Sequence, residues 1–304
     1  MKSTTLGMLA VIIFYLIAMV LIGVYYSKKN NDVNYFYLGG RKLGPFVTAM
    51  SAEASDMSSW LLMGLPGLAY LTGVADAGWT AIGLGIGTYL NWLFVAKRLR
   101  RYSVKANNSI TIPDFFSNRY RDNSKLLLGI SALIIVIFFV PYTASGFAAC
   151  GKLFSTLFHI PDFPAMIVSA VVIVAYTALG GFLAASTTDL IQSIVMTIAL
   201  VIVVFFGVSL AGGLDTVMDN AAALSGYLGL TETHDMVTKK ATPYSFLSIV
   251  STLAWGLGYF GMPHILLRFM GTEDEKKLTL SRRIATIWVV IAMFVAIFIG
   301  IVGY

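Results

Sequence analysis

The residues most capable of chemistry in this chain are carboxylates inside otherwise apolar segments. Asp56 stands in a stretch from about residue 45 to 71 that contains no Lys or Arg. An ionised carboxylate near the centre of a bilayer costs on the order of 3 kcal/mol, and such residues usually face a cavity and a partner. The candidate partner is therefore a mobile cation, either a proton or sodium, which prefers oxygen ligands as other hard cations do. The alternative is that Asp56 caps a half-helix through backbone N–H groups.

Two further carboxylates have two interpretations each. Glu53 lies one helical turn before Asp56, where it either shares the same site or points toward the cytoplasmic entrance. Asp189 follows Ser186-Thr187-Thr188, a string that is typical of a helix N-cap. The same position also places a carboxylate at the inner edge of a cavity.

Three aromatic residues with polar tips accompany these carboxylates: Tyr142, Trp255 and Tyr259. Buried Tyr and Trp side chains usually find a hydrogen-bond partner. An apolar slot with a few such groups suits a small zwitterion or ring. The alternative for each residue is ordinary packing or contact with lipid.

The elements that position these residues are predicted to be membrane-spanning helices. The chain has 304 residues, of which 58% are hydrophobic and 12% charged, and its mean hydropathy of +0.81 excludes a water-soluble globule. We expect one all-α integral membrane domain over residues 1–304, with the first segment retained as a span and not cleaved as a signal peptide. The eight predicted spans are 7–26, 45–71, 78–96, 126–151, 163–182, 189–212, 245–270 and 284–304.

The basic residues predict the orientation of these spans. Seventeen of the 21 Lys and Arg residues fall in 27–44, 97–125 and 268–283. Cytoplasmic loops collect Lys and Arg, so the N-terminus is expected outside the cell membrane. This topology explains the net charge of +6 without nucleic acid. One cysteine, three scattered histidines and the absence of hydrolase or nucleotide-binding motifs argue against an enzyme, a metal cluster or an ATP-driven pump.

Two of the predicted spans are interrupted. Span 245–270 carries several glycines and Pro263. Span 45–71 has polar residues crowded in its first half and helix-breaking residues in its second: Ser51, Glu53, Ser55, Asp56, Ser58 and Ser59, then Gly64, Pro66 and Gly67. The two are five spans apart and therefore run in opposite directions. Broken helices at matching positions of inverted halves indicate the midplane site of a secondary transporter. The alternative is that small residues only permit close helix packing.

Five strings resemble the sodium:solute symporter family, and most closely its proline-carrying members. The resemblance runs along nearly all of the chain. The strings are Gly39-Gly-Arg-Lys-Leu-Gly-Pro45, Ser55-Asp-Met-Ser58, Trp60-Leu-Leu-Met-Gly-Leu-Pro-Gly67, Gly180-Gly-Phe-Leu-Ala184, and Trp255-Gly-Leu-Gly-Tyr-Phe-Gly261 followed by Pro263-His264.

The resemblance implies a fold of two inverted five-helix repeats with one extra helix in front, the second repeat being incomplete here. It implies a sodium site that uses backbone carbonyls at Ala54 and Met57, with Asp56 and Asp189 tied to sodium coupling or passage. The residues that it implies for proline binding are Ser58, Tyr142, Trp255, Tyr259 and Pro263. It also links Arg41 to coupling.

The function expected from the resemblance is sodium-coupled symport of proline into the cell by alternating access. Sodium is then the coupling ion, proline the solute and the lipid bilayer the surroundings, with no other cofactor, nucleic acid or obligate protein partner. Ser59 and Met262, which depart from the family pattern, leave open another small organic solute or amino acid. The hydrophobic ending at Tyr304 leaves open a truncated membrane protein that does not transport.

Overall fold

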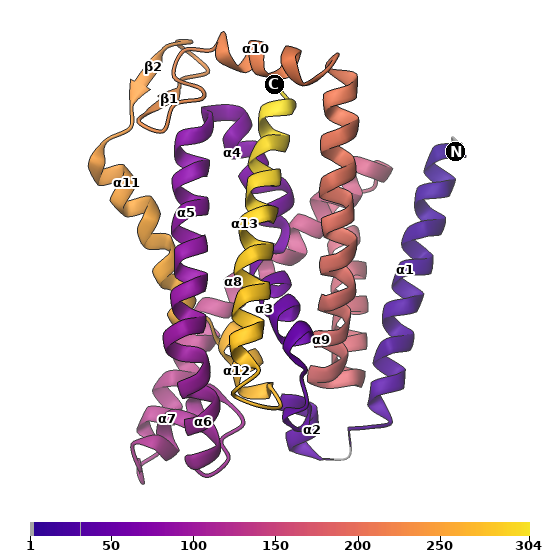
Figure 1. The fold of residues 1–304 in the computed structure, drawn as a ribbon. Coiled ribbons are helices and arrows are strands. Elements are labelled where there is room, and N and C mark those ends of the chain that lie inside the picture. Colours follow the sequence, from indigo (N-terminus) through magenta and orange to yellow (C-terminus); the bar gives the residue numbers. More distant parts are fainter. Residues whose placement is uncertain (1–2, 31) are drawn as a thin grey trace. The chain divides into compact units, whose positions relative to one another are not determined.

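The computed structural model describes residues 3–30 and 32–304, and its regular structure is almost entirely helical (Figure 1). The chain forms two compact units. The first comprises the residues up to Ser51, Arg98–Leu190 and Leu267–Glu275, and the second comprises Ala52–Lys97, Ile191–Leu266 and Lys276–Tyr304. Three helices have at least four residues in each unit: α3 (Pro45–Ser59), α9 (Asp162–Leu210) and α12 (Pro263–Gly271).

The first unit otherwise consists of helices and short turns. They are α1 (Ser3–Ser27), α2 (Val33–Leu38), the 3-10 turn η1 (Gly39–Arg41), α6 (Lys97–Lys105), α7 (Ile112–Arg119) and α8 (Leu126–Phe158). The α7 helix begins where Thr111 accepts a hydrogen bond from the Asp114 amide, and it ends at Tyr120. The Thr-x-Pro-Asp string is a capping signal of this kind, and a short helix in this loop is predictable from it.

The second unit contains the remaining elements. They are the π-helical turn η2 (Trp60–Gly64), α4 (Leu65–Thr72), α5 (Val74–Asn91), the π-helical turn η3 (Trp92–Ala96), α10 (Leu214–Ala222), β1 (Glu232–His234), β2 (Ala241–Pro243), α11 (Phe246–Leu253), the 3-10 segment η4 (Ala254–Gly261) and α13 (Leu278–Val302). The two strands pair antiparallel, with Thr233 opposite Thr242. Helix α13 packs against α4 and α5, and these helices lie side by side in Figure 1.

Both spans that the sequence marks as interrupted contain breaks. In α3 the break is at Ser58, whose φ and ψ are 44° and −157°. This break directly follows Met57, one of the two residues near which the sequence predicts unwound backbone, while η2 and α4 continue as helix through Gly64, Pro66 and Gly67. In the other span, Met262 is extended between η4 and α12, and the two parts bend by 47°.

A third break lies in α9, at Gly181. The predicted spans 163–182 and 189–212 leave residues 183–188 between them as a loop, but the helix resumes directly after Gly181, whose φ and ψ are 62° and −154°. A Cβ at Gly181 would also lie 2.8 Å from the Phe36 carbonyl oxygen, so both conformation and space require glycine. Asp189 therefore lies within the helix, and its interpretation as part of an N-cap is wrong.

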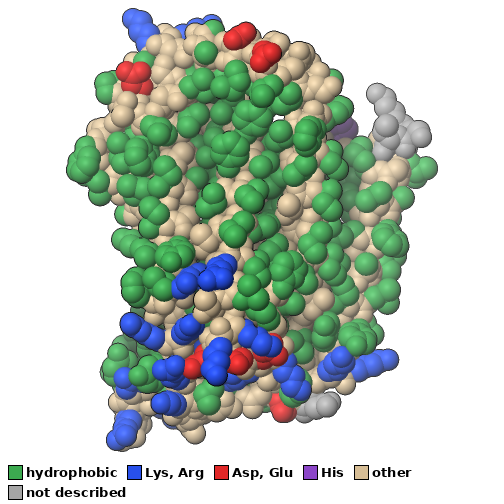
Figure 2. Space-filling model, in the orientation of Figure 1, with side chains coloured by type: hydrophobic (Ala, Val, Ile, Leu, Met, Phe, Trp, Pro, Cys, Tyr) green, Lys and Arg blue, Asp and Glu red, His purple; other side chains and the backbone are tan. Residues whose placement is uncertain are grey.

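Helices long and apolar enough to cross a membrane are present in both units. Among the described residues they are Thr5–Ser27, Val74–Lys105, Leu126–Phe158, Asp162–Leu210 and Leu278–Val302, together with the broken pair Phe246–Gly261 and Pro263–Gly271. Hydrophobic side chains cover most of the face shown in Figure 2. The chain is therefore a multi-pass membrane protein, while the division into eight spans stays a prediction.

Glycines fix how the broken segment η4 meets α5 within the second unit. A Cβ at Gly256 would lie 2.0 Å from the Gly83 carbonyl oxygen, and one at Gly87 would lie 2.3 Å from the Gly256 carbonyl oxygen. Two backbones therefore touch with no side chain between them, as small residues allow in membrane helix packing.

We expect Gly256→Ala to lower the unfolding temperature in detergent, because its methyl group must displace backbone of α5. Overpacking of this kind costs about 1–3 kcal/mol. Gly258→Ala is the matched control in the same segment, since nothing lies within 4 Å of its Cβ position. Equal unfolding temperatures for the two variants, followed by tryptophan fluorescence, would contradict the close contact.

Candidate functional site

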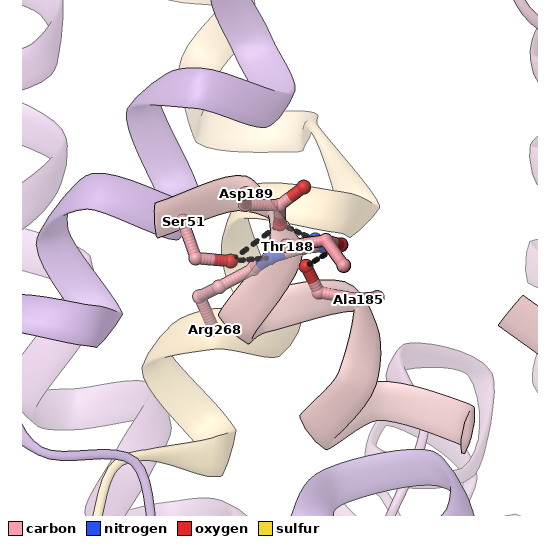
Figure 3. Close-up of polar contacts among 5 residues, drawn as sticks. All are labelled: Ser51, Ala185, Thr188, Asp189 and Arg268. Atoms are coloured by element: carbon pink, nitrogen blue, oxygen red, sulfur yellow. Dashed lines mark hydrogen bonds and ion pairs between the residues drawn. The ribbon is translucent and has the colours of Figure 1, made fainter. Parts of the chain in front are cut away.

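A buried polar cluster in the first unit joins Ser51 of α3, Asp189 of α9 and Arg268 of α12 (Figure 3). One carboxylate oxygen of Asp189, Oδ2, accepts hydrogen bonds from the Ser51 hydroxyl at 2.7 Å and from the Arg268 Nη2 at 2.9 Å. The Arg268 Nε donates in turn to the Ser51 hydroxyl oxygen at 3.0 Å. The nearby Thr188 hydroxyl bonds within its own helix, to the Ala185 carbonyl.

The electrostatics of this cluster are those of a mostly buried ion pair. The side chains of Arg268 and Asp189 are only 10% and 16% exposed. The face of Phe182 lies against the guanidinium, with 5.5 Å from its carbon to the ring centroid. Removing two charges from water is costly unless good geometry and further hydrogen bonds compensate. Ser51 supplies those further bonds, because its hydroxyl donates to one partner and accepts from the other.

Sequence reasoning missed Arg268 and Ser51 as partners of Asp189. Arg268 falls inside the predicted span 245–270, yet the charge count assigns it to a cytoplasmic loop. A signal was available, because an ionisable side chain inside a span needs a partner. Applied to Arg268, the need for a partner points to a carboxylate on another helix.

The second unit holds the Asp56 carboxylate, whose side chain is 7% exposed. The Tyr259 hydroxyl hydrogen-bonds to it, and the Nε2 of His264 lies 4.0 Å from its Oδ1. The backbone carbonyl of Tyr259 accepts a bond of 2.9 Å from the Asn91 side chain in α5. Asp56 thus sits beside both broken segments of this unit, and His264 is a neighbour that sequence reasoning did not select.

Glu53 is buried in the second unit and does not face solvent. It is 3% exposed, and its Oε1 accepts a hydrogen bond of 3.0 Å from the Trp92 indole. The Trp92 indole N–H, a neutral donor from η3, thus holds the buried Glu53 side chain. Its interpretation as a residue of the entrance receives no support from this position.

The other residues selected from the sequence fall in both units. Ala54 and Met57 lie in the turn of α3 before the break at Ser58, whose hydroxyl is 3.4 Å from the Trp60 amide. Trp255 packs its ring edge-to-face on Trp60 at 5.1 Å, and Pro263 is the first residue of α12.

Tyr142 lies in α8 of the first unit, with its ring 5.3 Å from that of Phe139. The described residues hold no group of three or more His, Cys, Asp or Glu side chains that could bind a metal ion.

Arg41 of the first unit lies outside the predicted spans and links three segments of the chain. Its guanidinium donates to the side chains of Asn108 and Ser103 at 3.1 Å, to the Met270 carbonyl at 2.7 Å and to the Ser109 carbonyl at 2.8 Å. Burial, and then the nearby Arg100 charge, lowers the pKa of Arg41 to about 10. The Met270 carbonyl belongs to the last turn of α12, where a cation also complements the helix dipole.

Comparison with known proteins identifies the family to which the chain belongs. The model of the sodium:solute symporter family matches residues 36–304, so the chain belongs to that family, whose members are transporters and not enzymes. The chain is 45% identical over 289 residues to the osmoregulated proline transporter OpuE of Bacillus subtilis, covering 95% of the chain and 57% of that protein. It is 46% identical over 288 residues to the sodium/proline symporter of Haemophilus influenzae, covering 94% of the chain and 56% of that protein. The chain therefore spans about half the length of the curated relatives that it matches.

A solved structure shares the fold. The structure of a Na+-coupled sialic acid symporter in its substrate-bound, outward-open state superposes with a TM-score of 0.79 at 19% identity. The match covers 96% of this chain and 59% of that one.

Proposed function

We propose that this chain belongs to a sodium-coupled symporter that carries L-proline into the cell by alternating access. The observation that carries the proposal is the Asp56 carboxylate beside two broken helices, with Tyr259 bonded to it. The family match and the names of the proline-transporting relatives support the same function. The proposal includes two inverted five-helix repeats, one extra helix in front and an N-terminus outside the membrane.

The sodium ion is proposed to bind where the carbonyls of Ala54 and Met57 adjoin the break at Ser58. Asp56 supplies a negative charge nearby, and the backbone carbonyls freed by a break supply oxygen ligands. Asp189 is proposed to serve sodium passage, and Arg41 to serve coupling.

Proline is proposed to bind next to the two broken helices. Trp255, Tyr259 and Pro263 belong to the second broken segment, and Ser58 belongs to the first. An apolar ring and a zwitterionic head suit aromatic faces together with a few polar groups. Tyr142 is proposed for the same role on the resemblance alone.

Coupling requires that both ligands favour the same conformation. A potential of 100 mV is worth about 2.3 kcal/mol per charge. A tenfold sodium gradient adds about 1.4 kcal/mol, and together they support roughly 500-fold accumulation at one sodium per proline.

Uptake of labelled proline with and without sodium, in cells that lack their own proline carriers, tests this function. The 304-residue chain is compared with any longer reading frame that contains it. We expect sodium to stimulate uptake, and unlabelled proline to compete better than other amino acids. No uptake by either form while the protein is present in the membrane would contradict the proposal. Competition mainly by another solute would move the assignment to that solute.

A further inference from the structure

An apolar groove of about 800 Å³ runs along α5 and α13 in the second unit. Residues from Val74 to Tyr89 line it on one helix, and residues from Thr286 to Ile301 line it on the other. Each stretch is about 22 Å long at roughly 1.5 Å per residue. The hydrocarbon of one leaflet is about 15 Å thick, so the groove is long enough for an acyl chain of that leaflet.

Small residues on α5 make the groove. Gly78, Ala81 and Gly85 recur on one face of this helix and line the hollow. Larger side chains stand at its rim, where Ile86 is 52% exposed and Phe294 is 69% exposed. Hydrophobic side chains follow both helices over much of their length in Figure 2. The result is a channel open along its side, as a flexible hydrocarbon chain requires.

One end of the groove is cationic. Tyr89 lines this end, and the guanidinium carbon of Arg282 lies 5.1 Å from the centroid of its ring. Arg282 is one helical turn before Thr286, which lines the groove. In the described part of the chain, the Arg282 Nε and the Thr286 hydroxyl have no hydrogen-bond partner. The groove thus ends at an N–H group and a hydroxyl group that are both available to bind a ligand.

Helix α13, which carries Arg282, contributes only basic side chains to this end, and the acidic residues nearest in sequence, Glu273, Asp274 and Glu275, precede it. Between Lys276 and Tyr304 the sequence has four basic residues, Lys276, Lys277, Arg282 and Arg283, and no acidic one. Basic pockets between membrane helices bind the head groups of anionic lipids. A phosphate offers the acceptor oxygens that a guanidinium recognises.

We propose that this groove binds an anionic phospholipid, with an acyl chain along α5 and α13 and the phosphate at Arg282. The apolar groove matches the length of an acyl chain in one leaflet, and the Arg282 guanidinium and the Thr286 hydroxyl at its end match a phosphate.

The test measures lipid retained by the detergent-purified protein, with native mass spectrometry. The probes are palmitoyl-oleoyl phosphatidylglycerol and, as the zwitterionic comparison, palmitoyl-oleoyl phosphatidylcholine. Arg282→Gln is expected to weaken retention of phosphatidylglycerol about fivefold, the order expected for one basic residue. Arg283→Gln is the matched control, because it removes the same charge from an exposed neighbouring position. It is expected to change retention little.

A second variant tests the channel itself. Ala81→Leu fills the groove from a helical position that favours Leu, and we expect it to reduce retention of both lipids. Circular dichroism checks that each variant is folded. Equal losses in the two arginine variants would overturn the proposal in favour of general surface attraction. Wild-type retention by folded Ala81→Leu would overturn it as well, since the lipid would then lie elsewhere.

Discussion

Replacing Arg268 by Met is expected to lower the free energy of unfolding by about 3–5 kcal/mol, because the buried Asp189 carboxylate loses its guanidinium. The same size of loss is expected for Asp189→Asn, which leaves the arginine charge without its ion-pair partner. The double variant, Arg268→Met with Asp189→Asn, is expected to recover much of either loss, since neither charge then remains buried. Denaturant unfolding in detergent micelles measures all three.

An exposed ion pair in the same unit provides the control. Arg101 donates to both carboxylate oxygens of Glu275 at 2.9 and 2.7 Å, but its side chain is 55% exposed. Such pairs contribute about 0–1 kcal/mol, so Arg101→Met is expected to change stability little. A loss in Arg268→Met no greater than that in Arg101→Met would contradict the buried pair.

The second large effect is expected at Asp56. Asp56→Asn keeps the shape of the side chain and a hydrogen-bond acceptor for Tyr259, but it removes the negative charge. If sodium binds beside this carboxylate, the sodium concentration that half-activates proline uptake rises by roughly 10- to 100-fold, the equivalent of a lost charged interaction of about 1.5–3 kcal/mol. Uptake measured over a range of sodium concentrations gives this value.

Asp76→Asn is the matched control for Asp56→Asn in the same unit. Asp76 lies in the first turn of α5, where its Oδ1 accepts a hydrogen bond from the Tyr244 hydroxyl. An amide oxygen can accept that bond, so sodium activation should stay near that of the wild type. Unchanged sodium dependence in Asp56→Asn, with wild-type amounts of protein in the membrane, would exclude a role for this charge in coupling.

The sequence predicted the helical class and the presence of breaks in two spans, and its Thr111–Asp114 string is a sufficient signal for α7, because each depends on local signals. Thr111 and Pro113 act within one helical turn, and Met262 and Pro263 interrupt their own segment. The position of the break at Ser58 was not predictable in this way. The polar residues of the first half of the span indicate unwound backbone near Ala54 and Met57, but no local signal selects Ser58, and only the surrounding packing can hold a serine at positive φ.

The candidate sites were only half predictable for a related reason. Asp56 and Asp189 attract attention because a carboxylate in an apolar segment is costly wherever it points. Their partners come from segments distant in sequence: Ser51 is 138 residues from Asp189, and Tyr259 is 203 residues from Asp56. Nothing in the local pattern selects such partners, because tertiary packing brings them together.

The cluster of Ser51, Asp189 and Arg268 also has a mechanical consequence. Each of these residues stands within two positions of the point where α3, α9 or α12 leaves the first unit. The cluster therefore ties these three helices to one another at the point where they leave the first unit. Bending of α3 is then confined to the residues after Ser51, and the break at Ser58 lies two helical turns further along that helix. The extended Met262 comes six residues before Arg268 in the chain, and like Ser58 it belongs to the second unit.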